Sequence, residues 1–131
     1  MPELSAESRK LFEDPNLLFV ATVNRDGSPQ VTPVWTALEN GNITFNTATG
    51  RAKERNLRRD GRIGLSIVAN DDPYSKIDVI GKVVDMIVGD VAEEQIDDLA
   101  EKYLGQRPYP WRRQGEERVK IIVEPVRLYG Q

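Results

Sequence analysis

Residues 17–48 read LLFVATVNRDGSPQVTPVWTALENGNITFNTA and are the strongest guide to the architecture. Three runs rich in β-branched and apolar residues are separated by two short segments that carry Asp26-Gly27 and Asn40-Gly41. Asp-Gly and Asn-Gly are strong hairpin signals because both residues of each pair tolerate positive φ. The stretch therefore predicts a three-stranded antiparallel meander with strands at 17–24, 29–38 and 42–48.

Three further strands follow the meander, and they are predicted at 62–69, 76–88 and 118–130. Gly81 indicates a bulge or bend in the second of them, and Pro125 is typical of an edge or bulge in the third. We expect residues 70–75 to form a loop. The 76–88 strand carries apolar residues on both of its faces. One face is expected to pack into the barrel core and the other against a helix or a second subunit.

Three helices complete the prediction, at 5–12, 51–59 and 90–104. Ser5 is a candidate N-cap for the first, and Asp90 and Glu93 occupy capping positions in the third. The third helix carries apolar residues on one face and ends before Gly105. Six strands joined mostly by hairpins indicate a mainly β fold, a small antiparallel β-barrel, formed as a single domain over residues 1–131.

The chain has 131 residues, a formal net charge of -3, and neither Cys nor His. These absences exclude disulfides, thiolate nucleophiles and a Ser-His-Asp triad, and we predict neither a catalytic side chain nor a metal site. No apolar run reaches the roughly 20 residues of a membrane-spanning helix, and the N-terminus resembles no signal peptide, so we expect a cytoplasmic protein. Carboxylate chemistry and chemistry supplied by an organic cofactor both remain open.

A basic segment, NTATGRAKERNLRRDGR at residues 46–62, runs against the overall negative charge. One interpretation is a solvated helix face, which is what most charge runs are. The other is an anion site, since a helix start offers free N–H groups and residues 46–50 supply small polar donors suited to a phosphate. The acidic remainder of the chain favours a compact phosphorylated ligand over long nucleic acid.

Two other sets of residues are candidates for chemistry. On strand 29–38, Gln30 and Thr32 are unusual for a packing face, and a flat heterocycle with polar edges suits them. The loop with Tyr109 and Trp111 either stacks on a ring or docks on its own barrel. Three acidic pairs are better explained by solvated turns and helix faces than by a cation site, and they lie at 71–72, 93–94 and 97–98.

The segments LLFVATVNRDGSPQVTPVW, NITFNTATGRAKERNLRRDGRIGLSI and VEPVRLYG together resemble the pyridoxamine 5′-phosphate oxidase-like flavin-binding split barrels. They are most similar to the branch of flavin- and deazaflavin-dependent oxidoreductases, and the RAKERNLRRD segment is the most specific part. The resemblance implies a six-stranded antiparallel split β-barrel. It also implies a homodimer with two cofactor sites between the subunits.

The same resemblance assigns cofactor-binding roles to sixteen positions of this chain. Those implied to hold the phosphate-bearing part are Asn46, Thr47, Ala48, Thr49, Arg51, Ala52, Lys53 and Asn56. Those implied to lie against the ring system are Gln30, Val31, Thr32, Pro33 and Val34. Those implied to come from the partner subunit are Lys76, Ile77 and Trp111.

The resemblance implies coenzyme F-420, a 5-deazaflavin, as cofactor, with FMN as the alternative. A basic track extending through Arg55, Arg58 and Arg59 suits the longer polyanionic tail of the deazaflavin. The chain stops at Gln131 without the C-terminal extension of true pyridoxamine-phosphate oxidases, so vitamin B6 oxidation is not expected. The function implied is hydride transfer between the reduced cofactor and a small organic acceptor, and the alternatives are an FMN-dependent oxidoreductase or a non-enzymatic cofactor carrier. We expect no nucleic-acid or membrane partner.

Overall fold

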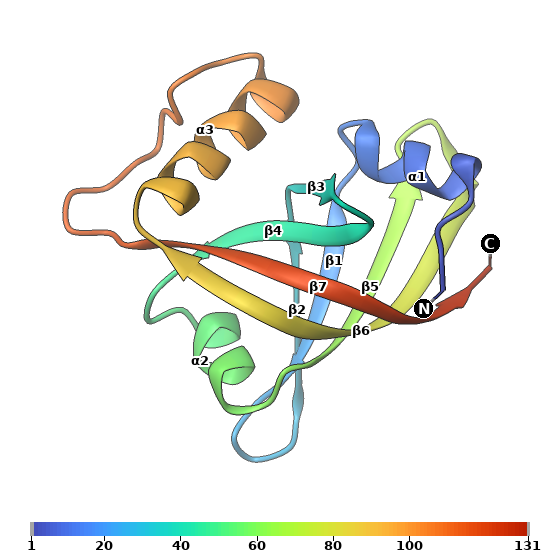
Figure 1. The fold of residues 1–131 in the computed structure, drawn as a ribbon, viewed down its shortest axis with the longest axis horizontal. Helices are drawn as coiled ribbons and strands as arrows, with labels where there is room; N and C mark the ends of the chain where they lie inside the picture. Colours follow the sequence, from blue (N-terminus) through green and yellow to red (C-terminus); the bar gives the residue numbers. More distant parts are fainter. Residues whose placement is uncertain (1, 131) are drawn as a thin grey trace.

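The computed structural model describes residues 2–130, which form one seven-stranded antiparallel sheet in the order β2-β1-β5-β6-β7-β4-β3 (Figure 1). The strands are β1 (Leu18–Val23), β2 (Pro29–Val34), β3 (Thr36–Glu39), β4 (Asn42–Ala48), β5 (Arg62–Ala69), β6 (Asp72–Val88) and β7 (Arg118–Tyr129). The helices are α1 (Ala6–Glu13), α2 (Ala52–Arg59) and α3 (Asp90–Leu104). The expected mainly β architecture with three short helices is confirmed.

The sheet has seven strands rather than six because the predicted 29–38 strand breaks at Trp35. Its first half, β2, pairs with β1, and its second half, β3, pairs with β4. These two strands form the opposite edges of the sheet, so a single residue carries the chain from one edge to the other and the sheet curls on itself. Both halves contain ordinary strand residues, which is why the sequence pattern shows no break.

The predicted loop at 70–75 is also corrected by the structure. Ala69 pairs with Asp72, so the chain turns within two residues and β6 begins at Asp72. The bulge predicted at Gly81 is confirmed by a register shift between Ile80 and Gly81. A Cβ at Gly81 would lie 2.5 Å from Cγ1 of Val123, so the close approach of β6 and β7 requires glycine here.

Both tight turns of the 17–48 meander are confirmed. Gly27 has φ 89°, and Asn40 and Gly41 have φ 51° and 82°, as the left-handed positions of hairpin turns require. Ser5 caps α1 by accepting a hydrogen bond from the Ser8 N–H at 3.1 Å. The N-cap of α3 is Gly89, so Asp90 lies in the first helical turn rather than at the cap.

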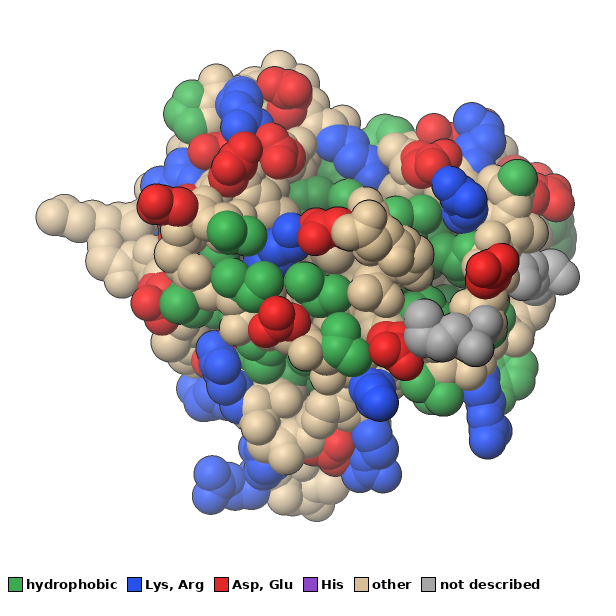
Figure 2. Space-filling view, viewed as in Figure 1, with side chains coloured by type: hydrophobic (Ala, Val, Ile, Leu, Met, Phe, Trp, Pro, Cys, Tyr) green, Lys and Arg blue, Asp and Glu red, His purple; other side chains and the backbone are tan. Residues whose placement is uncertain are grey.

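The interior of the curled sheet is filled by buried apolar side chains from β1, β4, β5, β6, β7, α1 and α2, and the partly buried Val34 of β2 and Leu38 of β3 pack against them. Its most completely buried members include Phe12, Leu18, Phe45, Ile67, Ile77 and Ile121. Figure 2 shows acidic side chains gathered over α3 and basic side chains around α2. Within residues 2–130, no helix is long and apolar enough to cross a bilayer.

Candidate functional site

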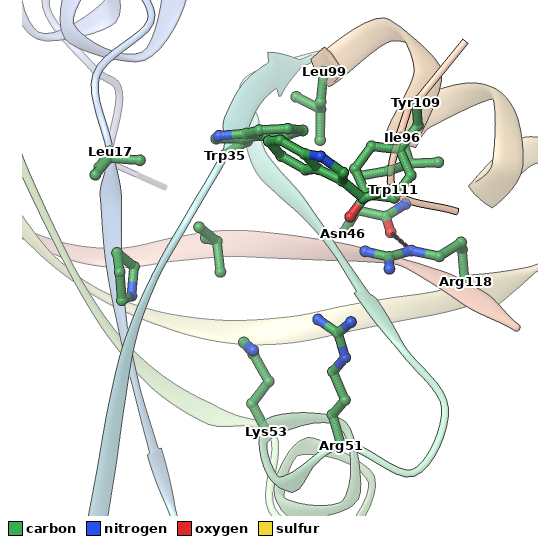
Figure 3. Close-up of a pocket in the computed structure, with 12 residues that line it drawn as sticks. Leu17, Trp35, Asn46, Arg51, Lys53, Ile96, Leu99, Tyr109, Trp111 and Arg118 are labelled. Atoms are coloured by element: carbon green, nitrogen blue, oxygen red, sulfur yellow. Dashed lines mark hydrogen bonds between the residues drawn. The ribbon is translucent and has the colours of Figure 1, made fainter. Parts of the chain in front are cut away.

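The orientation of α2 is set by its inner face. Leu57 is buried in the core, and the Asn56 amide donates to Thr22 Oγ1 at 3.0 Å and to Asn24 Oδ1 at 2.9 Å. The N-cap residue, Arg51, makes no side-chain hydrogen bond to the first turn, so its own side chain is free to extend away from the helix. Anchored in this way, α2 directs Arg51 and Lys53 to the same side (Figure 3).

Arg51 and Lys53 line a pocket of about 220 Å³ outside the barrel. Cationic and polar side chains form one side of it, and apolar and aromatic side chains form the other (Figure 3). The full lining is Leu17, Pro33, Val34, Trp35, Asn46, Arg51, Lys53, Ile96, Leu99, Tyr109, Trp111 and Arg118. The pocket thus collects residues from β2, β4, α2, α3, β7 and the loop before β7.

Lys53 is 8% exposed, and its ammonium group has neither a hydrogen-bond acceptor nor a carboxylate within the described part of the chain. Burial lowers the pKa of Lys53, and the charges of Arg51 and Arg118 lower it further. A buried cation without an anionic partner is unfavourable. A ligand anion bound beside Lys53 would therefore offset the unfavourable energy of burying its charge.

Arg118, on β7, is the most buried cation of the pocket at 3% exposed. Its Nε donates to Asn46 Oδ1 at 2.8 Å, and its guanidinium lies 5.3 Å from the centre of the Tyr109 ring. The Asn46 amide in turn donates to Gln95 Oε1 at 2.8 Å and to the Ala92 carbonyl at 2.9 Å. Asn46 therefore connects the floor of the pocket to α3 and holds Arg118 in one orientation.

Three aromatic rings, Trp35, Tyr109 and Trp111, form the wall opposite α2, and Tyr103 packs against Trp35 without lining the pocket. Trp35 stacks on Tyr103 with ring centres 5.4 Å apart, and Tyr109 and Trp111 each lie 6.0 Å from Trp35. The loop that carries Tyr109 and Trp111 is fastened to α3, because Asp97 accepts from the Tyr109 N–H at 2.8 Å. Trp111 remains 58% exposed, so an open aromatic surface borders the cationic side.

The structure brings six of the predicted positions together in this lining, and they are Pro33, Val34, Asn46, Arg51, Lys53 and Trp111. Trp111 reaches the pocket from the same subunit as Lys53, whereas the resemblance implied a contribution from the partner. Its exposure leaves its contacts with a partner untested.

The other predicted positions lie outside the pocket. They are Gln30, Val31, Thr32, Thr47, Ala48, Thr49, Ala52, Asn56, Lys76 and Ile77. Thr47 is fully buried at the same strand parity as Ile43 and Phe45, and its Oγ1 has no hydrogen-bond partner among the described residues, so its contact with a phosphate remains a prediction. Ile77 is fully buried in the core, and its contact with a cofactor of another subunit remains a prediction.

Three of these positions have other contacts. Asn56 is engaged by β1, as described above, and its Oδ1 accepts from Arg59 at 3.1 Å. Thr49 donates to Glu117 Oε1 at 2.7 Å. Lys76 is exposed and lies 4.0 Å from an oxygen of Asp78. Gln30, Val31 and Thr32 lie on the edge strand that leads away from Pro33, and their contact with a ring remains a prediction.

The remaining arginines of the basic segment have protein partners. Arg58 pairs with Glu54 at 2.7 Å, and Arg62 pairs with Asp60 at 2.7 Å. Arg55 donates to the Gly50 carbonyl and Arg59 to the Val23 carbonyl, both at 2.6 Å. Arg55, Arg58 and Arg59 line a separate groove with Arg25, so the expected basic track is not one continuous surface inside the pocket.

Arg118 is the main functional residue that sequence reasoning missed. It opens a strand far from the basic segment, and no local motif marks it. The sequence places Trp35 in a predicted strand and Tyr109 in a predicted loop. Their contact could not be predicted, because it depends on the bend between β2 and β3. Among residues 2–130, no group of three or more potential ligands could hold a metal ion. The acidic residues Glu93 and Asp97 instead bind Arg112, each at 3.1 Å.

Comparison with known proteins identifies the class of this fold and site. The chain matches the family Pyridoxamine 5'-phosphate oxidase over residues 4–130. It therefore belongs to the pyridoxamine 5′-phosphate oxidase family, and its curled antiparallel sheet is a split barrel.

Several solved structures have this fold. An F-420 reductase is 31% identical with a TM-score of 0.84, and the match covers 100% of both chains. A conserved hypothetical protein, Rv2991 of Mycobacterium tuberculosis, is 21% identical with a TM-score of 0.77, covering 98% of this chain and 84% of that one. A putative pyridoxamine 5'-phosphate oxidase of Lactobacillus delbrueckii is 23% identical with a TM-score of 0.61, covering 97% and 93%. No curated protein sequence matches significantly.

Proposed function

We propose that this protein is an oxidoreductase of the flavin and deazaflavin type that transfers hydride between reduced coenzyme F-420 and a small organic acceptor. The observation that carries the proposal is Lys53, a buried cation that lacks an anionic partner among residues 2–130 and lines a pocket with an aromatic wall. A ligand that joins an anionic group to a planar ring matches both sides of this pocket. A flavin-type cofactor is such a ligand.

The lining residues fit the cofactor in a defined way. Lys53 and Arg51 would hold the phosphate, where charge-assisted hydrogen bonds are strong because water is partly excluded. Pro33 and Val34 offer the ring an apolar edge of β2, and the exposed Trp111 offers it an aromatic surface. When bound, a reduced deazaflavin supplies a hydride. The protein's contribution is to position the acceptor and to keep water out, for which no acid or base is required.

We assign coenzyme F-420 rather than FMN as the cofactor for two reasons. The F-420 reductase is similar to this chain over its whole length. A second groove lies beside the same short helix as Lys53. Its lining has four arginines against one carboxylate, Glu54, and this excess of positive charge suits a polyanionic tail. Arg55 is one helical turn beyond Arg51, so a tail leaving the pocket past Arg51 would meet these arginines next.

Titration of the purified protein with each cofactor tests the choice. We expect F-420 to bind more tightly than FMN, and we expect a deazaflavin without the glutamate tail to lose that advantage. Equal or reversed affinities would overturn the assignment of F-420 and favour the FMN-dependent alternative. Bound reduced cofactor is then mixed with a panel of quinones, enones and tetrapyrroles. Oxidation by any of them supports the enzyme, and a cofactor that stays reduced throughout supports the carrier.

We also propose a homodimer, because one outer face of the sheet is apolar. The strand register aligns Val31, Ala21, Gly64 and Ile80 in one row across β2, β1, β5 and β6. Val31 is 60% exposed and Ile80 is 46% exposed, and Phe19 in the next row is 40% exposed. A contiguous apolar row of this kind marks an interaction surface. The row begins beside Pro33, which lines the pocket, so a second subunit seated there would border the cofactor site.

Light scattering at micromolar concentration checks the assembly. The wild-type protein is expected as a dimer, and Ile80→Lys is expected to shift it toward the monomer without loss of secondary structure. Lys82→Glu, a charge change two residues further along β6, serves as the control. A wild-type monomer would contradict the proposal.

A further inference from the structure

Two of the three cations that line the pocket, Arg51 and Arg118, contact the same carboxylate. Glu116, in the loop before β7, places Oε1 2.9 Å from Arg118 and Oε2 3.3 Å from Arg51. The Glu116 side chain is 13% exposed. Burial by itself raises the pKa of Glu116, but the hydrogen bond and charge of Arg118, with the charge of Arg51, hold it below its ordinary value. Glu116 is therefore ionised at neutral pH.

Glu116 compensates only part of the charge in the pocket. Three cationic side chains line the pocket, and one carboxylate serves two of them. Lys53 receives nothing from Glu116, and among the described residues no other carboxylate reaches it. The pocket thus retains an excess of positive charge, while Nη2 of Arg51 is already engaged by Glu116.

The two contacts of Glu116 differ in strength. Arg118 is almost fully buried and is held a second time by Asn46, so it keeps its position whether or not Glu116 is present. The Arg51 side chain is 47% exposed, its contact is the longer one, and among residues 2–130 it has no other hydrogen-bond or ion-pair partner. An arriving anion would therefore break the contact with Arg51 and leave the contact with Arg118 in place.

We propose that Glu116 is an internal counter-ion of this pocket, a specificity-determining residue that an anionic ligand must displace from Arg51 before Arg51 and Lys53 can bind the ligand together. This inference rests on the proposed function only in taking the pocket as a phosphate site. Glu116 lowers the affinity for every anion. It thereby favours ligands whose charge is concentrated enough to compete with a carboxylate, such as a phosphate group, over diffuse or weakly charged anions.

The test compares Glu116→Gln with the wild type, using inorganic phosphate as the probe and titration calorimetry or chemical-shift titration as the readout. Glu116→Gln keeps the shape of the side chain and removes its charge. We expect the affinity for phosphate to rise about tenfold, the order expected when a unit charge a few ångström from a partly screened anion is removed. Glu117→Gln is the matched control, because Glu117 is exposed and bonds to Thr49 rather than to the pocket. It should leave the affinity unchanged.

Unchanged or weaker phosphate binding in Glu116→Gln, or an equal gain in Glu117→Gln, would overturn the proposal. A second measurement uses only the wild-type protein: the carboxyl carbon signal of Glu116 should move when phosphate saturates the pocket, and an unmoved signal would overturn it too. Failure of the proposed function is a separate outcome. If phosphate binding behaves as expected but neither F-420 nor FMN binds, the role of Glu116 as counter-ion is supported and the cofactor assignment is wrong.

Discussion

The two faces of α2 carry similar charge in the sequence and have different roles in the structure. On the outer face, Arg55, Arg58 and Arg59 each contact a carbonyl or a carboxylate of the protein. On the inner side, Lys53 is more deeply buried than any of them, and among residues 2–130 it has no such contact. Positive charge alone therefore does not mark a binding residue. Lys53 differs because its side chain is mostly buried and its charge has no partner, so part of the desolvation cost is recovered when an anion binds.

The largest effect is expected where α2 is anchored to the barrel. Leu57→Ala should lower the free energy of unfolding by about 2–5 kcal/mol, since it removes a buried side chain from the core and leaves a cavity. Arg55→Ala, on the outer face of the same helix, is the control and should change stability little. Denaturant unfolding measures both. Similar losses in the two variants would mean that the faces of α2 are not distinct.

Ligand affinity should depend strongly on Lys53 of α2 and hardly at all on Arg62, which begins β5. Lys53→Ala is expected to weaken binding of the phosphate-bearing cofactor by about 1.5–3 kcal/mol, the range for hydrogen bonds to charged groups. Arg62→Ala removes the same charge, but Arg62 is exposed and paired with Asp60, so no measurable loss is expected. Fluorescence titration compares them. If the losses are equal, the basic segment acts as a diffuse electrostatic patch and the phosphate site lies elsewhere.

Asn56 distinguishes a structural role from a binding role. Asn56→Ala removes two hydrogen bonds from α2 to β1 and should lower the free energy of unfolding by about 1–3 kcal/mol. Affinity for inorganic phosphate per folded molecule should stay close to that of the wild type, because Asn56 lines the arginine groove but not the pocket. Unfolding curves and phosphate titration are read on the same samples. Weaker binding with unchanged stability would show that Asn56 binds the ligand and does not act through the structure of α2.

The smallest effect concerns pH and has opposite signs for stability and binding. The pKa of Lys53 is lowered from 10.5 in the folded protein, so between that lowered value and 10.5 the unfolded chain holds more protons. The free energy of unfolding contributed by Lys53 therefore rises with pH in this window, while affinity for an anion falls. Lys102, whose pKa is lowered to about 8, contributes to stability with the same sign.

The difference between wild type and Lys53→Met isolates the contribution of Lys53. Measurements stay below a pH of about 10, since Tyr103, with its pKa raised to about 12, adds a contribution of opposite sign above the ordinary tyrosine value. A wild-type affinity that does not fall across this range would show that Lys53 does not bind the anion as an ammonium group.

Local patterns predicted the parts of the fold that depend on neighbouring residues. The turns at Gly27 and Gly41, the bulge at Gly81 and the cap at Ser5 each follow from the conformation of one or two residues, and the structure confirms them. The break at Trp35 was not visible, because β2 and β3 read as one strand and only their pairing with different partners separates them.

The candidate site was predictable to the same extent. Arg51, Lys53 and Asn46 lie in or beside one short segment, and its residue types and its resemblance to known flavin-binding proteins pointed to a phosphate. The burial of the Thr47 and Ile77 side chains was not predicted, because a motif does not show which way a side chain faces across a sheet. The roles of both residues toward a cofactor remain predictions.

The sequence by itself determined the mainly β class, the helix that carries the basic residues, and the absence of Cys and His, which excludes thiolate and imidazole chemistry. Only the tertiary structure decided which cations meet. Closure of the sheet brings Arg118 against Asn46, 72 positions apart in the chain, and places Glu116 between Arg118 and Arg51. Hairpins and helices are set by interactions over a few residues, whereas the charge of a pocket is the sum of groups that only long-range packing brings within a few ångström of one another.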